Sequence, residues 1–424
     1  MHKRLGVWLS AVCCLLCAVT PAAAGDDSEA QVWRQEVQQL KSRLDVLETK
    51  LAEREAVQAG AAPGNAIVQL PSGLHGVEMS GFVDTTYTYN FDEPRNGLNT
   101  LRVFDTRSNS FMLNNAELVV QKPVSAESPV GFRTDLDFGT DAEVLGTLTP
   151  TPGLGIGTDE LDVQQAFVEY LAPIGNGLDV KVGKFVTLHG AEVIESRDNW
   201  NISRSLLFGF AIPFTHTGIR ASYPWTEGFS TVVGVNNGWD VVDDNNKAKT
   251  MEFGFSAVPL EGTSLGATYM VGAEQNFNNG NQRHLFDLVA GWQPIEPLQL
   301  KLNYDYGLED DGTAFANNAV WQGLAGYARY AITDRWAVAL RSEFFHDQDG
   351  VRTGFNTTGL NGIVGSNGLK MYETTLTSEY QVNKHLTARL EYRHDNAPER
   401  IFRSDSIGQR SYQDTIGMEF IAPF

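Results

Sequence analysis

The last residues of the chain alternate between apolar and polar side chains, and this pattern constrains the fold more than any other feature. One face of the segment is apolar and carries Tyr412, Ile416, Met418, Phe420, Ala422 and Phe424. The opposite face carries Gln413, Thr415, Gly417, Glu419 and Ile421. A final strand that is apolar on one side and ends on an aromatic residue is typical of outer-membrane β-barrels. Lipid offers no partner to a free backbone polar group, so only helices and closed barrels span a membrane.

The same alternation recurs along most of the chain and predicts about sixteen strands. The candidates span residues 77–91, 111–122, 130–139, 161–172, 178–186, 214–223, 229–236, 250–258, 264–273, 283–293, 298–308, 321–332, 336–346, 369–382, 385–395 and 412–424. Short turns alternate with long polar connections, as in outer-membrane barrels. The sequence has no repeat of fixed period, which argues against a β-propeller. The sequence therefore predicts an all-β fold, a transmembrane antiparallel β-barrel, over residues 76–424.

The first residues have the pattern of a secretory signal peptide, residues 1–24. Lys3 and Arg4 precede an apolar stretch, and a run of alanines offers a cleavage site. All three cysteines lie inside this segment, so the mature chain would contain no disulfide. Removing the two basic residues takes the formal net charge from −20 to −22. Such acidity disfavours nucleic acid as a partner.

Residues 25–58 predict a coiled-coil helix ahead of the barrel. The a positions of its heptads are Ala30, Val37, Leu44 and Leu51, and the d positions are Trp33, Leu40, Leu47 and Arg54. A lone helix of this length is marginal in water, so self-association is expected. The alternative is an amphipathic helix that packs on the chain's own barrel. Residues 59–75 are rich in Ala, Gly and Pro and predict a linker.

Charged residues alternate on the strand faces that would point into the barrel. They are Arg133, Asp135, Asp137, Lys301, Asp305, Arg341, Glu343, Arg389, Glu391 and Arg393. In a barrel of this size they would line a water-filled lumen. Opposite charges would also pair and brace the wall, so we expect most to brace it and a minority to set selectivity.

The longest connection, residues 187–213, is the strongest candidate for a functional segment. It contains an apolar run with Leu206, Leu207, Phe208 and Phe210, which should not face water. Folded into the lumen, it would bury that run and line a pore constriction with Glu192, Glu195, Arg197, Asp198 and Arg204. The alternative is an outer loop packed against a neighbouring subunit.

Signals for enzymatic chemistry are weak. The histidines are scattered, and no HExxH, GxSxG or CxxC motif is present. His216 would lie on a strand near Arg220 and is expected to be a structural hydrogen-bonding group. We therefore expect no catalytic residues, no metal site and no cofactor.

Several stretches resemble the OmpL-like class of bacterial β-barrel porins. They include LNNAELVVQKPV, GFRTDLDFGTDAEVLG, DVQQAFVEYLAP, VKVGKF and GAEVIESRDNWNISRSLLFGFAIPFTHTGIR. The resemblance covers residues 76–424 and is strongest over 111–258. It implies a diffusion channel of the outer membrane, and the preceding coiled coil is similar to the trimerising segment of other porins. The chain lacks the ladder of basic lumen residues that phosphate-selective porins carry.

The sequence thus predicts an outer-membrane porin for passive diffusion of small hydrophilic solutes, embedded in lipid as a homotrimer. The acidic excess among the candidate constriction residues favours a weak cation preference. The inward arginines are the opposing argument. A barrel enzyme and a plugged structural or adhesive barrel are the competing classes.

Overall fold

The structure is a computed structural model that describes residues 76–145, 161–313, 317–355, 368–405 and 408–424. The expected signal peptide, coiled coil and linker lie outside these residues. Among the described residues, no helix combines the length and the hydropathy that crossing a bilayer requires.

Sixteen long strands form the wall, and a two-stranded hairpin lies in the last long connection. The wall strands are β1 (Glu78–Asn90), β2 (Ser110–Lys122), β3 (Val130–Phe138), β4 (Leu161–Ala172), β5 (Leu178–Val186), β6 (Thr215–Thr226), β7 (Phe229–Asn236), β8 (Thr250–Ala257), β9 (Thr263–Ala273), β10 (Gln282–Ile295), β11 (Leu298–Glu309), β12 (Ala319–Ala331), β13 (Trp336–Asp347), β14 (Leu369–Asn383), β15 (Leu386–Asn396) and β18 (Tyr412–Pro423). The hairpin is β16 (Phe402–Ser404) and β17 (Gly408–Arg410). Short helices are α3 (Thr140–Leu145), η1 (Ser196–Asp198) and η2 (Leu207–Ala211).

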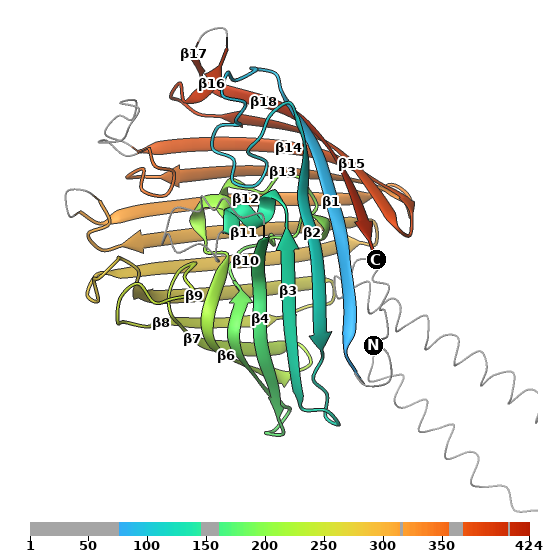
Figure 1. Cartoon of the computed structure of the whole chain (residues 1–424), viewed down its shortest axis with the longest axis vertical. Coiled ribbons are helices and arrows are strands. Elements are labelled where there is room, and N and C mark those ends of the chain that lie inside the picture. The colour runs from blue at the N-terminus through green and yellow to red at the C-terminus, as the bar shows by residue number, and fades with distance from the viewer. Residues whose placement is uncertain (1–75, 146–160, 314–316, 356–367, 406–407) are drawn as a thin grey trace, which may run out of the picture. The chain divides into compact units, whose positions relative to one another are not determined.

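Each wall strand pairs with its neighbours in antiparallel register, and β1 pairs with β18 to close the barrel (Figure 1). The closing register runs from Phe82 opposite Pro423 to Asn90 opposite Thr415. The predicted transmembrane antiparallel barrel is confirmed, and so is the count of its strands. The β16–β17 hairpin was not predicted.

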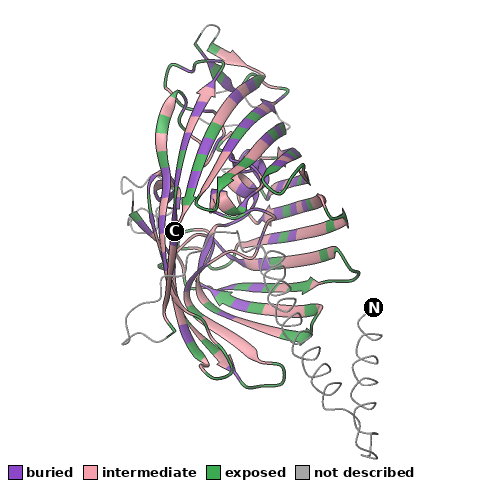
Figure 2. Cartoon of the chain, turned by 90° about the vertical axis from the view of Figure 1, so that its right-hand side faces the viewer, coloured by how far each residue is buried: buried purple, intermediate pink, exposed green. Residues whose placement is uncertain are grey.

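Side chains alternate along the strands between an apolar outer face and a polar inner face, and Figure 2 shows the matching alternation of exposed and buried residues. On β18, Met418 and Phe420 are 40% and 47% exposed, whereas Glu419 between them is fully buried. The terminal Phe424 exchanges backbone hydrogen bonds with Gly81, N–H to O at 2.9 Å and 3.1 Å. A side chain at Gly81 would meet the Phe424 ring 2.5 Å away, so glycine there lets the seam close.

The connections alternate as expected from the sequence. Tight turns such as residues 227–228 and 296–297 join strands at one rim, and long segments join them at the other. The barrel interior contains an apolar core as well as polar side chains. It combines the long connection between β5 and β6 with the inward side chains Trp321, Phe345 and Met371 of β12, β13 and β14.

Candidate functional site

The connection between β5 and β6, residues 187–214, turns into the barrel and is called the inward loop below. The backbone N–H of Ala191 donates to the Asn303 side chain on β11 at 3.1 Å. Further along, Asn201 donates to Thr377 on β14 at 2.7 Å. The Ser196 hydroxyl donates to Glu419 on β18. The loop therefore reaches from one side of the inner wall to the other.

The apolar run of the inward loop packs against the wall. Leu206, Leu207 and Phe208 are essentially inaccessible to solvent. Leu207 lies against Gly323 of β12, where a Cβ atom would be 2.6 Å from the Leu207 Cδ1 atom. The Trp321 indole N–H donates to the carbonyl of Ala211 at 3.0 Å and fixes the end of η2. Burial of this run was expected from the sequence, and the structure shows it for these three residues.

Carboxylates of the wall bind the free backbone N–H groups of the inward loop. Glu343 on β13 accepts from Leu206 and Leu207 at 2.7 and 3.2 Å. Glu391 on β15 accepts from Ile202 and Ser203 at 2.6 and 3.0 Å. Charge-assisted bonds of this kind are stronger than those between neutral groups, so these two residues anchor the loop backbone.

Arginines of the wall bind the carbonyl oxygens of the same loop. Arg341 donates to Ser203 O and Arg393 donates to Arg204 O, both at 2.6 Å. Arg389 donates to the carbonyls of Ser196 and Asn199 at 2.8 and 2.9 Å. A buried backbone polar group without a partner is costly. Alternating acidic and basic side chains on β13 and β15 therefore satisfy both kinds of backbone group.

Two of the five residues predicted to line a constriction do not face an aqueous pore. Glu192 is buried and pairs with Arg341 at 2.7 Å, while its other oxygen accepts from the backbone N–H of Ser205 at 2.7 Å. Arg204 is buried over the Phe104 ring and pairs with Asp141 of α3 at 3.3 Å. The sequence predicted that Glu192 and Arg204 would be exposed to the pore. Both are instead buried, because they bind other groups of the folded loop and of the wall.

The other three predicted constriction residues lie in η1 or directly before it. Arg197 stacks 4.4 Å from the centre of the Phe82 ring and its guanidinium lies 3.8 Å from Glu117. The Asp198 side chain is 31% exposed and that of Arg197 13% exposed. Burial, with the charge of Asp198 second, raises the pKa of Glu195. Asp198 is thus the most accessible member of this group.

The predicted lumen residues point inward, but the inward loop and ion pairs cover most of them. Arg133 pairs with Asp135 at 2.8 Å and keeps 33% of its side chain exposed. Lys301 lies 4.3 Å from the centre of the Trp200 ring on the loop. The other members are buried: Asp135, Asp137, Asp305, Arg341, Glu343, Arg389, Glu391 and Arg393. Most of these side chains are therefore covered by protein rather than exposed to water.

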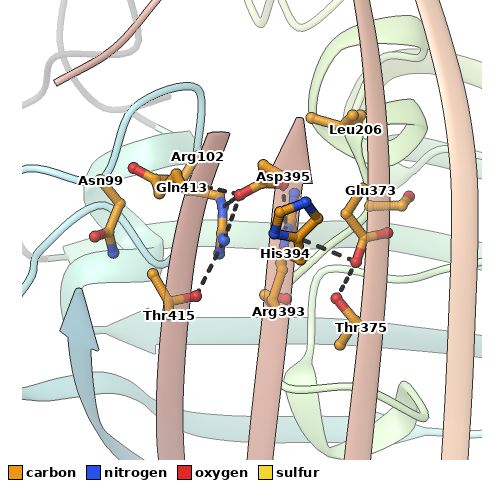
Figure 3. Close-up of polar contacts among 12 residues, drawn as sticks. Asn99, Arg102, Leu206, Glu373, Thr375, Arg393, His394, Asp395, Gln413 and Thr415 are labelled. Carbon is orange, nitrogen blue, oxygen red and sulfur yellow. Dashed lines mark hydrogen bonds and ion pairs between the residues drawn. The ribbon is translucent and has the colours of Figure 1, made fainter. Parts of the chain in front are cut away.

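The first long connection supplies a partner that the sequence did not reveal. Arg102 reaches Asp395 on β15 at 2.6 Å and the Thr415 hydroxyl on β18 at 3.2 Å (Figure 3). The same Asp395 accepts from Arg393 at 2.9 Å and from Gln413 at 3.2 Å. A polar residue in a long polar connection carries no signal that it folds inward, so this network could not be foreseen.

The structure also brings His189 of the inward loop beside His216 of β6. Their ring centres are 6.4 Å apart. Burial lowers the pKa of His189 to about 3, so this imidazole is neutral at physiological pH. The sequence predicted a structural role for His216 but not its neighbour, because 26 residues separate the two histidines in the chain.

The fold matches solved outer-membrane barrels. OmpT of Vibrio cholerae in a trimer form shares 11% identity, covers 82% of this chain and 99% of its own, and superposes with a TM-score of 0.54. The channel DcaP of Acinetobacter baumannii shares 13% identity, with coverages of 82% and 97% and a TM-score of 0.53. An anion-selective porin from Comamonas acidovorans shares 10% identity, with coverages of 82% and 99% and a TM-score of 0.54. At such identities the likeness shows the fold alone.

No curated protein sequence matches the chain. A family model does, and it spans residues 76–424, which include every wall strand and the inward loop. The family and the fold place the protein in the bacterial outer membrane as a porin-type channel. The chain belongs to the family described as "Putative beta-barrel porin-2, OmpL-like".

Proposed function

We propose that the protein is a passive channel for small hydrophilic solutes with a weak preference for cations and without enzymatic activity. The observation that carries the proposal is the inward loop, which narrows the barrel and is bonded to the wall from β11 to β18. A fixed constriction selects solutes by width and charge and requires no covalent chemistry.

The distribution of paired charges supports cation preference. Arg341 and Arg389 each bind wall carboxylates, at 3.0 Å to Glu373 and at 2.7 Å to Glu379, so their charge is offset locally. The most accessible acidic group of the inward loop is Asp198, whose side chain is 31% exposed. Its negative charge attracts cations within about one Debye length, roughly 8 Å.

Conductance and reversal potential test the proposal together. The protein reconstituted in planar bilayers should give steady channels and, under a potassium chloride gradient, a reversal potential of the sign for cations. Asp198→Asn should shift that potential towards zero, because it removes the most accessible acidic charge of the loop. Asp334→Asn, in an exposed turn, is the matched control and should leave it unchanged.

A plugged barrel is the second candidate, and the depth of burial inside the wall favours it. Arg341, Asp135 and Asp305 are all fully buried although they point inward. A plugged barrel or a barrel enzyme would insert into bilayers without steady channels. A clear anion preference would be consistent with a channel but would contradict the predicted preference for cations.

Trimeric assembly is proposed on separate grounds. OmpT of Vibrio cholerae has the same fold and is described in a trimer form. The heptad pattern from Ala30 to Leu51 in this sequence is suited to association. Native mass spectrometry of the detergent-extracted protein should give a multiple of three chains, and a monomer that retains residues 25–58 would contradict the proposal.

A further inference from the structure

Two histidines and a glutamate from different parts of the chain converge inside the wall. His189 comes from the inward loop, His216 from β6 and Glu252 from β8. All three are buried, with 1%, 0% and 0% of their surface exposed. One possible ligand atom from each lies within 4.8 Å of the others, and among the described residues no other group of His, Cys, Asp and Glu does this.

Hydrogen bonds define which ring nitrogen of each histidine carries the lone pair. The Nδ1 atom of His216 lies 3.2 Å from the carbonyl oxygen of Gly238. A carbonyl only accepts, so Nδ1 carries the hydrogen and Nε2 has the lone pair. That Nε2 atom is 3.2 Å from the hydroxyl of Thr187, which can donate to it.

His189 is also held through Nδ1, but its Nε2 atom, unlike that of His216, has no partner. Its Nδ1 atom lies 2.5 Å from the Thr268 hydroxyl, which is itself 3.3 Å from an oxygen of Asp287. Thr268 donates to the carboxylate, so its oxygen accepts from Nδ1–H of His189. The Nε2 lone pair of His189 is then left without a hydrogen-bond partner although it is buried. A metal-binding histidine typically donates a hydrogen bond from one ring nitrogen and binds the metal with the lone pair of the other, and His189 has one nitrogen available for each role.

We propose that His189 Nε2, His216 Nε2 and a carboxylate oxygen of Glu252 bind one zinc ion. Two histidines, one glutamate and an open fourth position make a known ligand set for zinc. Tetrahedral zinc with bonds of about 2.0–2.1 Å needs ligand atoms roughly 3.3 Å apart. The separations of up to 4.8 Å between the three ligand atoms would therefore have to shorten by up to about 1.5 Å.

Arg220 on β6 limits the affinity of this site. Its guanidinium binds both oxygens of Glu252, at 2.9 and 3.1 Å, and donates to the carbonyl of Val186 at 3.0 Å. Each carboxylate oxygen keeps a second lone pair for a metal. The arginine orients Glu252, while its positive charge repels a divalent cation. Removing Arg220 should consequently tighten zinc binding, which a purely structural cluster would not do.

Bound zinc would fix the first part of the inward loop to the wall. Through His189 it would join the loop to β6 and β8, on the side opposite the Glu343 and Glu391 anchors. The site is independent of whether the barrel conducts, so its test does not depend on the proposed function.

The test uses the full-length protein without a histidine tag, folded in detergent and stripped with a chelator. Native mass spectrometry and calorimetric titration with zinc chloride should show one zinc ion per chain. His189→Gln and Glu252→Gln should each weaken binding at least about tenfold, since each removes one of three ligands. His385→Gln, in an exposed turn, should bind as the wild type does. Arg220→Gln should bind more tightly.

Absence of stoichiometric zinc in the wild-type protein would overturn the proposal, and so would unchanged binding in His189→Gln. Faster migration on unheated gels verifies that each variant is folded. If a variant does not fold, X-ray absorption at the zinc edge of the wild-type protein decides. Two imidazole ligands and one carboxylate support the site, and oxygen ligands alone reject it.

Discussion

Replacing Leu207 by alanine tests whether packing holds the inward loop against the wall. Leu207 is fully buried, at the first residue of η2 and against Gly323. Alanine removes the side-chain atoms that fill this contact and leaves a cavity. Buried Leu→Ala replacements cost about 2–5 kcal/mol. We expect the lower half of that range, about 2–3 kcal/mol, because a loop can settle into the space more readily than a barrel wall.

That loss has a measurable effect on the loop. Every 1.4 kcal/mol is about tenfold in an equilibrium constant, so the detached loop becomes roughly 30- to 150-fold more populated. The assay is limited trypsin digestion of the folded protein, with peptides identified by mass spectrometry. Cleavage after Arg204 requires detachment, because this residue is buried. In bilayers the variant should also give larger and noisier current steps.

Val193→Ala is the matched control, since Val193 is in the same loop and 41% exposed. It should leave both the cleavage rate and the current steps unchanged. If Leu207→Ala is cleaved after Arg204 no faster than this control, the apolar contact does not anchor the loop. The wall carboxylates and arginines would then be sufficient by themselves.

Three further outcomes are expected. Glu343→Gln should weaken loop attachment by about 1–3 kcal/mol, because a neutral amide oxygen replaces the carboxylate that binds two backbone N–H groups. The rate of trypsin cleavage after Arg204 measures this loss. Glu296→Gln, in an exposed turn, is the control. Gly81→Val should impair barrel closure, because its side chain would collide with Phe424, and a folded, heat-resistant band of normal intensity on unheated gels would contradict this. Burial raises the pKa of Asp141 to about 7 from 3.8 although Arg204 lowers it, so the folded state holds this proton more tightly and stability should fall as pH rises from about 4 to 7. Asp141→Asn should flatten that decline, and an identical pH profile of heat resistance in the two proteins would refute it.

The wall was predictable because its signal is local. On β18 and β3, outward apolar and inward polar residues alternate with the period of a strand, and the structure confirms both. Glycines and prolines marked the tight turns. The β16–β17 hairpin was missed because its strands are only three residues long and carry no alternation.

The site was less predictable because its contacts depend on the register of distant strands. The apolar run at Leu206 showed that the loop must be buried, but not that Glu343 and Glu391 would accept its backbone N–H groups. Glu192 and Arg204 looked like pore charges, since a sequence does not show that Arg341 and Asp141 lie beside them. Likewise, His189 and His216 meet only through the turn of the chain between β5 and β6.

The attachment of the inward loop has a consequence for the order of folding. The loop follows the fifth strand of the chain, whereas its anchors Glu343, Glu391 and Glu419 lie on β13, β15 and β18. It cannot settle until the last strands are in place, so a nascent or truncated barrel leaves Leu206, Leu207 and Phe208 uncovered. An unfinished chain would thus expose an apolar segment that is buried in the completed barrel. Periplasmic chaperones and proteases could recognise this segment and so distinguish unfinished from completed barrels.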